Sequence, residues 1–158
     1  MRRSVPPTLT NPHVQEIKRL QSEIYRLRNV IVKQVPESLR TILTSYHQCE
    51  SKDGASGWEL LAADQVVQTA TVLPHPEGAF LGDRAYCPLC GDGVESRYES
   101  GFSHPEGLRR HLIGWGNMAK CSIFAAAAEL ARYHLDHQFA AAEGKSRPID
   151  PHFSGTGS

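Results

Sequence analysis

The sequence predicts a mainly helical fold that also contains one small β-hairpin, an α+β arrangement in which helix dominates. Three observations carry this prediction. Apolar residues recur every three or four positions over residues 14–35, as on one face of a helix. An alanine-rich stretch over 118–142 shows the same period. Between them, residues 84–102 hold short alternating segments around a glycine-rich turn, which favours a hairpin.

Length and composition fit a globular chain without a membrane segment. The 158 residues suffice for one domain of ordinary size, and no run of eighteen apolar residues occurs. The first residues lack an apolar signal core, so we expect no secretion. The four cysteines do not resemble a secreted disulfide framework, and we therefore expect a cytoplasmic protein.

The N-terminal part is predicted to be helical over residues 11–73, after a disordered arm at 1–10. Asn11 and Pro12 form a strong helix start. The following helix carries a heptad stripe of Ile17, Leu20, Ile24, Leu27 and Ile31. We expect this stripe to pack against the rest of the chain. The alternative is contact with a protein partner, or a homodimer, through residues 14–35.

Two further helices are expected before residue 74. Pro36 ends the first helix, and a second should run from Glu37 to about Cys49. The spacing of Ser56 and Glu59 predicts a capping box that opens a third helix, which ends before Pro74. The residues expected to be buried in these two helices are Leu39, Ile42, Leu43, Tyr46, Leu60, Ala63, Val67 and Ala70.

Residues 74–142 are predicted to form a second unit, which begins with a Pro- and Gly-bearing linker. Strands are expected around 84–86 and 94–102. A capping box of Ser103 and Glu106 should then open a short helix, which the segment 114–117 breaks. A long helix over 118–142 should follow, with a disordered tail at 143–158. Its buried stripe is predicted to be Phe124, Ala128, Ala131, Leu135 and Phe139.

Cysteine and histidine spacing in this unit indicates a zinc site. Cys87 and Cys90 lie two residues apart on a tight turn, and His111 falls on the short helix, as tetrahedral zinc requires. With Phe102 and Leu108, these residues resemble a zinc finger of the two-Cys, two-His type. The resemblance implies that the two cysteines and the histidine bind zinc, while the aromatic residue and the leucine form a small core.

The match departs from that family in two ways. Eleven residues separate Cys90 from Phe102, more than the family uses, and no second histidine lies three to five residues after His111, where the family has it. We expect Cys121 to complete the site because the helix break lets the chain turn back. The rival ligands are His104 and the pair His134 and His137, and the other alternative is a metal-free pair of thiols. The predicted ligand set is Cys87, Cys90, His111 and Cys121.

The expected function is that of a non-enzymatic, zinc-stabilised binding protein that contacts nucleic acid or a nucleic-acid-handling complex. Residues 1–40 hold eight Lys or Arg against three Glu, which suits phosphate contact. Direct base reading is not expected, since the finger resemblance places Gly107, which has no side chain, at a base-reading position and a single finger covers only about three base pairs. The expected contact residues are Arg26, Arg28, Lys33, Arg109, Arg110 and Lys120.

The sequence also suggests two other functions. A protein-only adaptor or inhibitor would use the heptad stripe with Trp58 or Trp115 as anchors. A metal-dependent nuclease would rest on residues 133–137, which faintly resemble the histidine element of His-Asn-His nucleases. No asparagine follows Asn117, and the segment lies in a helical pattern. We therefore expect no enzymatic activity.

Overall fold

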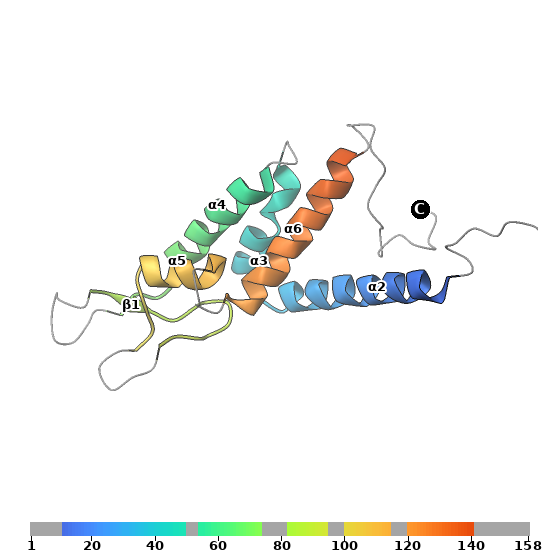
Figure 1. The fold of residues 1–158 in the computed structure, drawn as a ribbon. Coiled ribbons are helices and arrows are strands. Elements are labelled where there is room, and N and C mark those ends of the chain that lie inside the picture. The colour runs from blue at the N-terminus through green and yellow to red at the C-terminus, as the bar shows by residue number, and fades with distance from the viewer. Residues whose placement is uncertain (1–10, 50–53, 74–81, 95–99, 115–119, 141–158) are drawn as a thin grey trace, which may run out of the picture.

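The computed structural model describes residues 11–49, 54–73, 82–94, 100–114 and 120–140. The predicted arm at 1–10, the linker at 74–78 and the tail at 143–158 lie outside these ranges. Helices dominate, and one two-stranded antiparallel sheet lies at one end of the helical bundle (Figure 1). The predicted fold class, mainly helical with a small β element, is confirmed.

Helix α2 spans Pro12–Lys33 and begins where the sequence predicts. The side chain of Asn11 accepts a hydrogen bond from the amide of His13 at 2.9 Å, and Pro12 occupies the first helical turn, where its missing N–H has no cost. Gln34 caps the other end, and Pro36 follows two residues later. Both boundaries therefore result from local chemistry.

The heptad stripe of α2 faces solvent. Its five side chains are between 37% and 48% exposed. A different face of α2 meets helix α6. Its residues Tyr25 and Val32 each follow a stripe isoleucine by one position, so they lie about 100° around the helix axis from it. There the ring of Tyr25 lies 5.0 Å from that of Tyr133, and Val32 is buried. The expectation that the stripe packs against the rest of the chain is wrong, because periodicity identifies a face but not its partner.

The second predicted helix is shorter than expected. Helix α3 spans Glu37–Leu43 and gives way to the 3-10 turn η1 at Ser45–Gln48. Leu39, Leu43 and Tyr46 are buried as predicted, and Ile42 is partly buried against them. The tighter turn lets Ser45 accept a hydrogen bond from the Trp58 indole at 2.8 Å.

Helix α4 spans Gly54–Thr69, so it begins before the predicted capping box. Ser56 lies inside the helix and is not its cap. The buried face holds Ala63 and Val67, as predicted, whereas Leu60 is exposed. Tertiary packing shifts this face, because Trp58 turns inward and stacks 6.3 Å from Phe124 of helix α6. Trp58 is only 5% exposed and is thus unavailable as a surface anchor.

Helix α6 spans Ser122–Ala140 and packs against α2, α3 and α4. Its predicted stripe is buried at Phe124, Ala128, Ala131 and Leu135. The side chain of Phe139 lies outside the described residues. One continuous core joins Val32 of α2 to Ala131 of α6. Among the described residues, no helix combines the length and apolar character that a membrane crossing requires.

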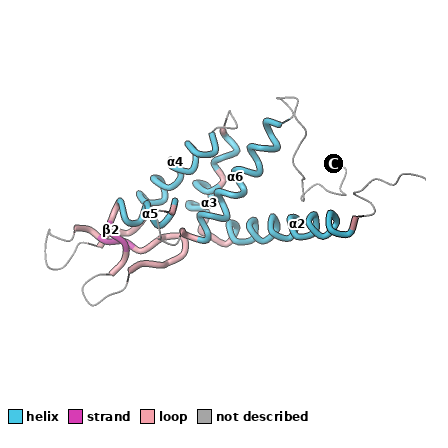
Figure 2. Tube along the Cα trace, viewed as in Figure 1, coloured by secondary structure: helices cyan, strands magenta, loops and turns pink. Residues whose placement is uncertain are grey.

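The small sheet consists of β1 (Arg84–Ala85) and β2 (Phe102–Ser103), with Ala85 opposite Phe102. The glycine before β2 is required: Gly101 has φ +81°, and a Cβ there would lie 2.9 Å from the Ala85 carbonyl. Helix α5 (Glu106–Ile113) follows, and no side chain caps it. The predicted Ser103 capping box is wrong, because Ser103 belongs to β2 (Figure 2).

The aromatic contact between α4 and α6 yields a stability prediction. Phe124 is fully buried, so Phe124→Ala should lower the free energy of unfolding by about 3–5 kcal/mol. Leu61 on α4 is 58% exposed, and Leu61→Ala should change stability by less than about 1 kcal/mol. Urea denaturation of both variants measures the difference. Similar losses in the two would show that this core is misassigned.

Candidate metal centre

A tight turn presents the first two thiols. The Gly91 amide donates to the Cys87 carbonyl at 2.8 Å, and the Cys87 amide donates to the Asp92 carbonyl at 2.9 Å. Gly91 has φ +78°, a conformation that glycine adopts without strain. The Asp92 amide then points at the sulfur of Cys90, 3.4 Å away. Backbone amides directed at sulfur stabilise thiolates, which are the form that binds metals.

Helix α5 supplies an imidazole to the same place. His111 is 5% exposed, and its ring stacks on Phe102 with 4.4 Å between ring centroids and 21° between planes. Leu108, one turn earlier, is fully buried. Strand β2 and helix α5 thus hold the histidine as the finger resemblance implies, with the aromatic residue and the leucine beneath it.

The predicted chain reversal places Cys121 beside His111. Gly114 has φ +81° and ends α5. The Cys121 amide donates to the His111 carbonyl at 2.8 Å, which fixes the two ligand residues side by side. Cys121 also immediately precedes α6, and the Ala125 amide in the first turn of that helix donates to the Cys121 carbonyl at 2.8 Å. The start of α6 is therefore tied to the end of α5.

All four predicted ligand residues come together. One ligand atom from each of Cys87, Cys90, His111 and Cys121 lies within 4.8 Å of all the others. The sulfurs of Cys87 and Cys121 are 3.9 Å apart, and the Cys90 sulfur lies 3.3 Å from His111 Nε2. A tetrahedral zinc ion would set such pairs about 3.8 Å and about 3.5 Å apart. The cluster could therefore hold a metal ion with little rearrangement.

The three histidines considered as rival ligands contact other residues instead of the cysteines. His104 Nε2 lies 3.2 Å from the carbonyl of Val67. His134 packs its ring against His47 of η1 at 4.4 Å, and His137 packs against Tyr133 at 4.3 Å. Burial, together with the neighbouring His47, lowers the pKa of His134. Among the described residues, none of the three belongs to the cysteine cluster.

Protons are unevenly shared among the thiols. The contact with Cys121 and burial raise the pKa of Cys87, and burial raises that of Cys90. Hydrogen bonds from Cys87 and then His111, together with the α6 amides, lower the pKa of Cys121. The two sulfurs of Cys87 and Cys121 thus favour one shared proton over two thiolates, because they lie 3.9 Å apart.

Several predicted contact residues instead form ion pairs within the fold. Arg26 pairs with Glu23 at 2.6 Å, and Lys120 pairs with Glu59 of α4 at 2.7 Å. Arg109 pairs with Asp64 of α4. Arg110 is exposed on α5. Arg28 and Lys33 form no ion pair with another residue that the structure describes.

Glu59 is a residue that the sequence interpretation missed. Its spacing from Ser56 predicts a capping box. In the structure its carboxylate instead binds Lys120 at 2.7 Å and Arg132 of α6 at 3.3 Å. It thereby holds Lys120, the residue before Cys121, against α4. The contact spans 61 residues of sequence, so no local pattern could have signalled it.

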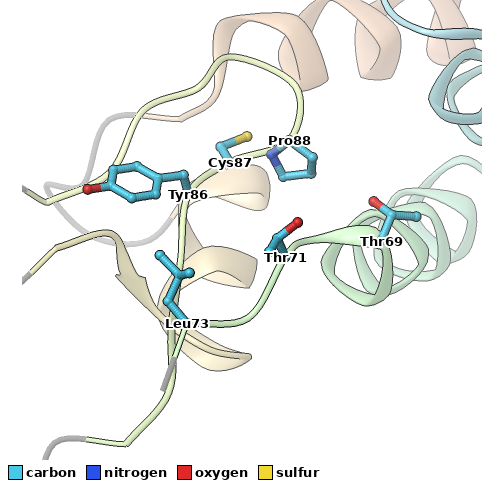
Figure 3. Close-up of a pocket in the computed structure, with 6 residues that line it drawn as sticks. All are labelled: Thr69, Thr71, Leu73, Tyr86, Cys87 and Pro88. Carbon is cyan, nitrogen blue, oxygen red and sulfur yellow. The ribbon is translucent and has the colours of Figure 1, made fainter. Parts of the chain in front are cut away.

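A pocket of about 360 Å³ lies beside the cysteine turn. It opens between the segment that follows α4 and the turn itself (Figure 3). No carboxylate or imidazole lines it among the described residues, so no acid–base pair converges there. Its lining residues are Thr69, Thr71, Leu73, Tyr86, Cys87 and Pro88.

The proton distribution predicts how metal affinity depends on pH. Cys87 and Cys90 have raised pKa values, so both must release a proton when they bind a metal as thiolates. Near neutral pH, affinity should then rise by roughly 100-fold per pH unit, because two protons are released. Titration with Co²⁺, followed by its thiolate absorption at several pH values, measures the slope. An affinity independent of pH would contradict the assignment.

No family model, curated protein or solved structure matches this chain. The likeness to a zinc finger therefore rests on the ligand residues and on the frame that presents them, a two-stranded sheet followed by a helix. Two features distinguish this frame: a long segment between Cys90 and Phe102, and a fourth ligand residue taken from the start of the next helix.

Proposed function

We propose that this chain is a non-enzymatic binding protein in which one zinc ion has a structural role. The observation that carries the proposal is the convergence of three thiols and one imidazole within 4.8 Å of one another. Four protein ligands complete a tetrahedron and leave no open position for water or substrate. Cys87, His111 and Cys121 are also buried, as the ligands of structural sites usually are.

The donor set favours zinc over other metals. Three sulfurs and one imidazole nitrogen match the Cys₃His sites that bind zinc with tetrahedral geometry. Magnesium and calcium prefer oxygen ligands, which this cluster lacks among the described residues. Such a site needs its thiols reduced, so we also propose a reducing compartment such as the cytoplasm.

Nucleic acid, or a complex that handles it, is the proposed partner. Two features support this proposal, namely the finger-like frame and the charge of α2, which carries five basic and two acidic residues. The N-terminal half of α2 extends away from the bundle, whereas its C-terminal half, which carries Arg28 and Lys33, adjoins it (Figure 1). Arg109 and Lys120 pair with acidic groups of α4, and Arg26 pairs with Glu23 of its own helix. The proposed contacts are therefore chiefly Arg28 and Lys33, together with the exposed Arg110.

A protein-only adaptor is the second candidate, and the exposed apolar stripe of α2 favours it. Apolar side chains at the centre of an interface contribute most of its binding energy, whereas phosphates are contacted by cations. Two tryptophans were predicted from the sequence as anchors of such an interface. Trp58 is buried, and Trp115 lies outside the described residues. The two candidates differ in the salt dependence of binding.

Metal content tests the zinc proposal. Native protein should contain one zinc per chain, and Cys121→Ser should lose it and lower the melting temperature by ~10 °C or more. Cys49 is half-buried and outside the cluster, so Cys49→Ser is the matched control and should keep its zinc. Elemental analysis and thermal denaturation provide the readouts. Full zinc in Cys121→Ser would exclude Cys121 as the fourth ligand.

Salt dependence tests the partner proposal. With two or three phosphate contacts, a plot of log K against log salt should have a slope of about −2 to −3 on duplex DNA. Replacing Arg28 and Lys33 together by Ala should flatten it by about 2. Arg109→Ala is the control and should leave the slope unchanged, since Arg109 pairs with Asp64. Absence of nucleic-acid binding, or binding insensitive to salt, would reject this partner and favour the adaptor.

A further inference from the structure

The exposed face of α2 is a continuous apolar stripe on a helix of 22 residues. Its members are 37% to 48% exposed although they are large aliphatic side chains. Exposed apolar patches of this kind mark interaction sites in proteins that otherwise bury such residues. The stripe consists of Ile17, Leu20, Ile24, Leu27 and Ile31.

The order of residues in the stripe specifies one kind of partner. The spacings alternate between three and four, which places the isoleucines at heptad position a and the leucines at position d. A β-branched residue at a with leucine at d favours parallel, two-stranded coiled coils over larger assemblies. The helix that best complements this stripe is therefore another copy of α2 in the same orientation.

The flanking charges agree with that arrangement. Glu23 lies at position g and Arg28 at the next position e. In a parallel pair, Glu23 of one copy faces Arg28 of the other, twice per dimer. In an antiparallel pair, position g faces position g, which would bring the glutamates at 16 and 23 towards each other. Arg28 forms no ion pair with another described residue of its own chain, whereas Glu23 pairs with Arg26, so the parallel contact would take Glu23 from that exposed pair.

We propose that two copies of this chain associate through α2 as a parallel, two-stranded coiled coil. Contacts within each chain leave room for the second helix, because α6 packs on the neighbouring face of α2 through Tyr25 and Val32. The association does not depend on the metal or on nucleic acid, but it would occupy the stripe that the adaptor candidate uses. It thus goes beyond the proposed function and is tested separately from it.

The first experiment measures the molar mass of the zinc-loaded chain by light scattering as its concentration rises. Wild type should shift from monomer to dimer, and Ile24→Glu should weaken the dimer at least ~100-fold because it places a charge in the seam of both copies. Leu61→Glu is the matched control, since Leu61 is an exposed aliphatic residue of α4. It should dimerise as wild type does. Unchanged zinc content and circular dichroism establish that Ile24→Glu is folded.

The second experiment tests charge pairing and orientation. Glu23→Lys and Arg28→Glu should each weaken the dimer, and the two together should restore it. A chain with Ile17→Cys should form a disulfide between the two copies on mild oxidation, since only the parallel arrangement brings the two residues 17 together. Wild type under the same oxidation is the control for the native thiols.

Four results would overturn the proposal. They are a wild-type chain that stays monomeric at every concentration, a dimer indifferent to Ile24→Glu, failure of the double charge reversal to restore association, and no disulfide at position 17. A monomer that still binds zinc and nucleic acid would reject the dimer and leave the proposed function standing.

Discussion

One constraint governs the part of the molecule that follows α4. The thiol turn, the short helix α5 and the start of α6 must meet at one point. The sheet has two residues per strand, and α5 has eight, too little to bury a core alone. Ligands 34 residues apart in sequence are nonetheless within contact distance. A metal held by them would replace the missing apolar burial, since binding energy at such a site is also folding energy.

Ion pairs join this centre to the helical bundle and thereby change the role of its basic residues. Glu59 and Asp64 of α4 bind Lys120 and Arg109, which flank the ligand residues Cys121 and His111. Because these side chains are partly exposed, each pair adds little stability alone. Their effect is positional: they orient α4 against the metal centre. Cations that a sequence interpretation assigns to phosphate contact are thus used inside the fold.

Features fixed by neighbouring residues could be predicted, whereas features fixed by distant packing could not. The Asn11 cap, the cysteine turn and the break at Gly114 depend on local chemistry, and the structure shows all three. The position of Cys121 beside His111 could be predicted from that break, because the break lets the chain turn back. The start of α4 and the orientation of the α2 stripe depend on which surface each helix meets. Periodicity shows that a helix has an apolar face, but it does not show what covers that face.

The α2 helix is where the two proposals meet, and its heptad positions show that they are compatible. Arg26 and Lys33 fall at position c, on the side of the helix away from an a/d seam. A parallel pair would bury the isoleucines and leucines while leaving these cations exposed in two copies. Arg28 would pair with Glu23 of the other copy and thereby release Arg26 from Glu23, so each copy would offer Arg26 and Lys33 to phosphate. Affinity would gain from simultaneous engagement of both copies. Dimerisation would therefore strengthen nucleic-acid binding by a helix whose charge per copy is modest.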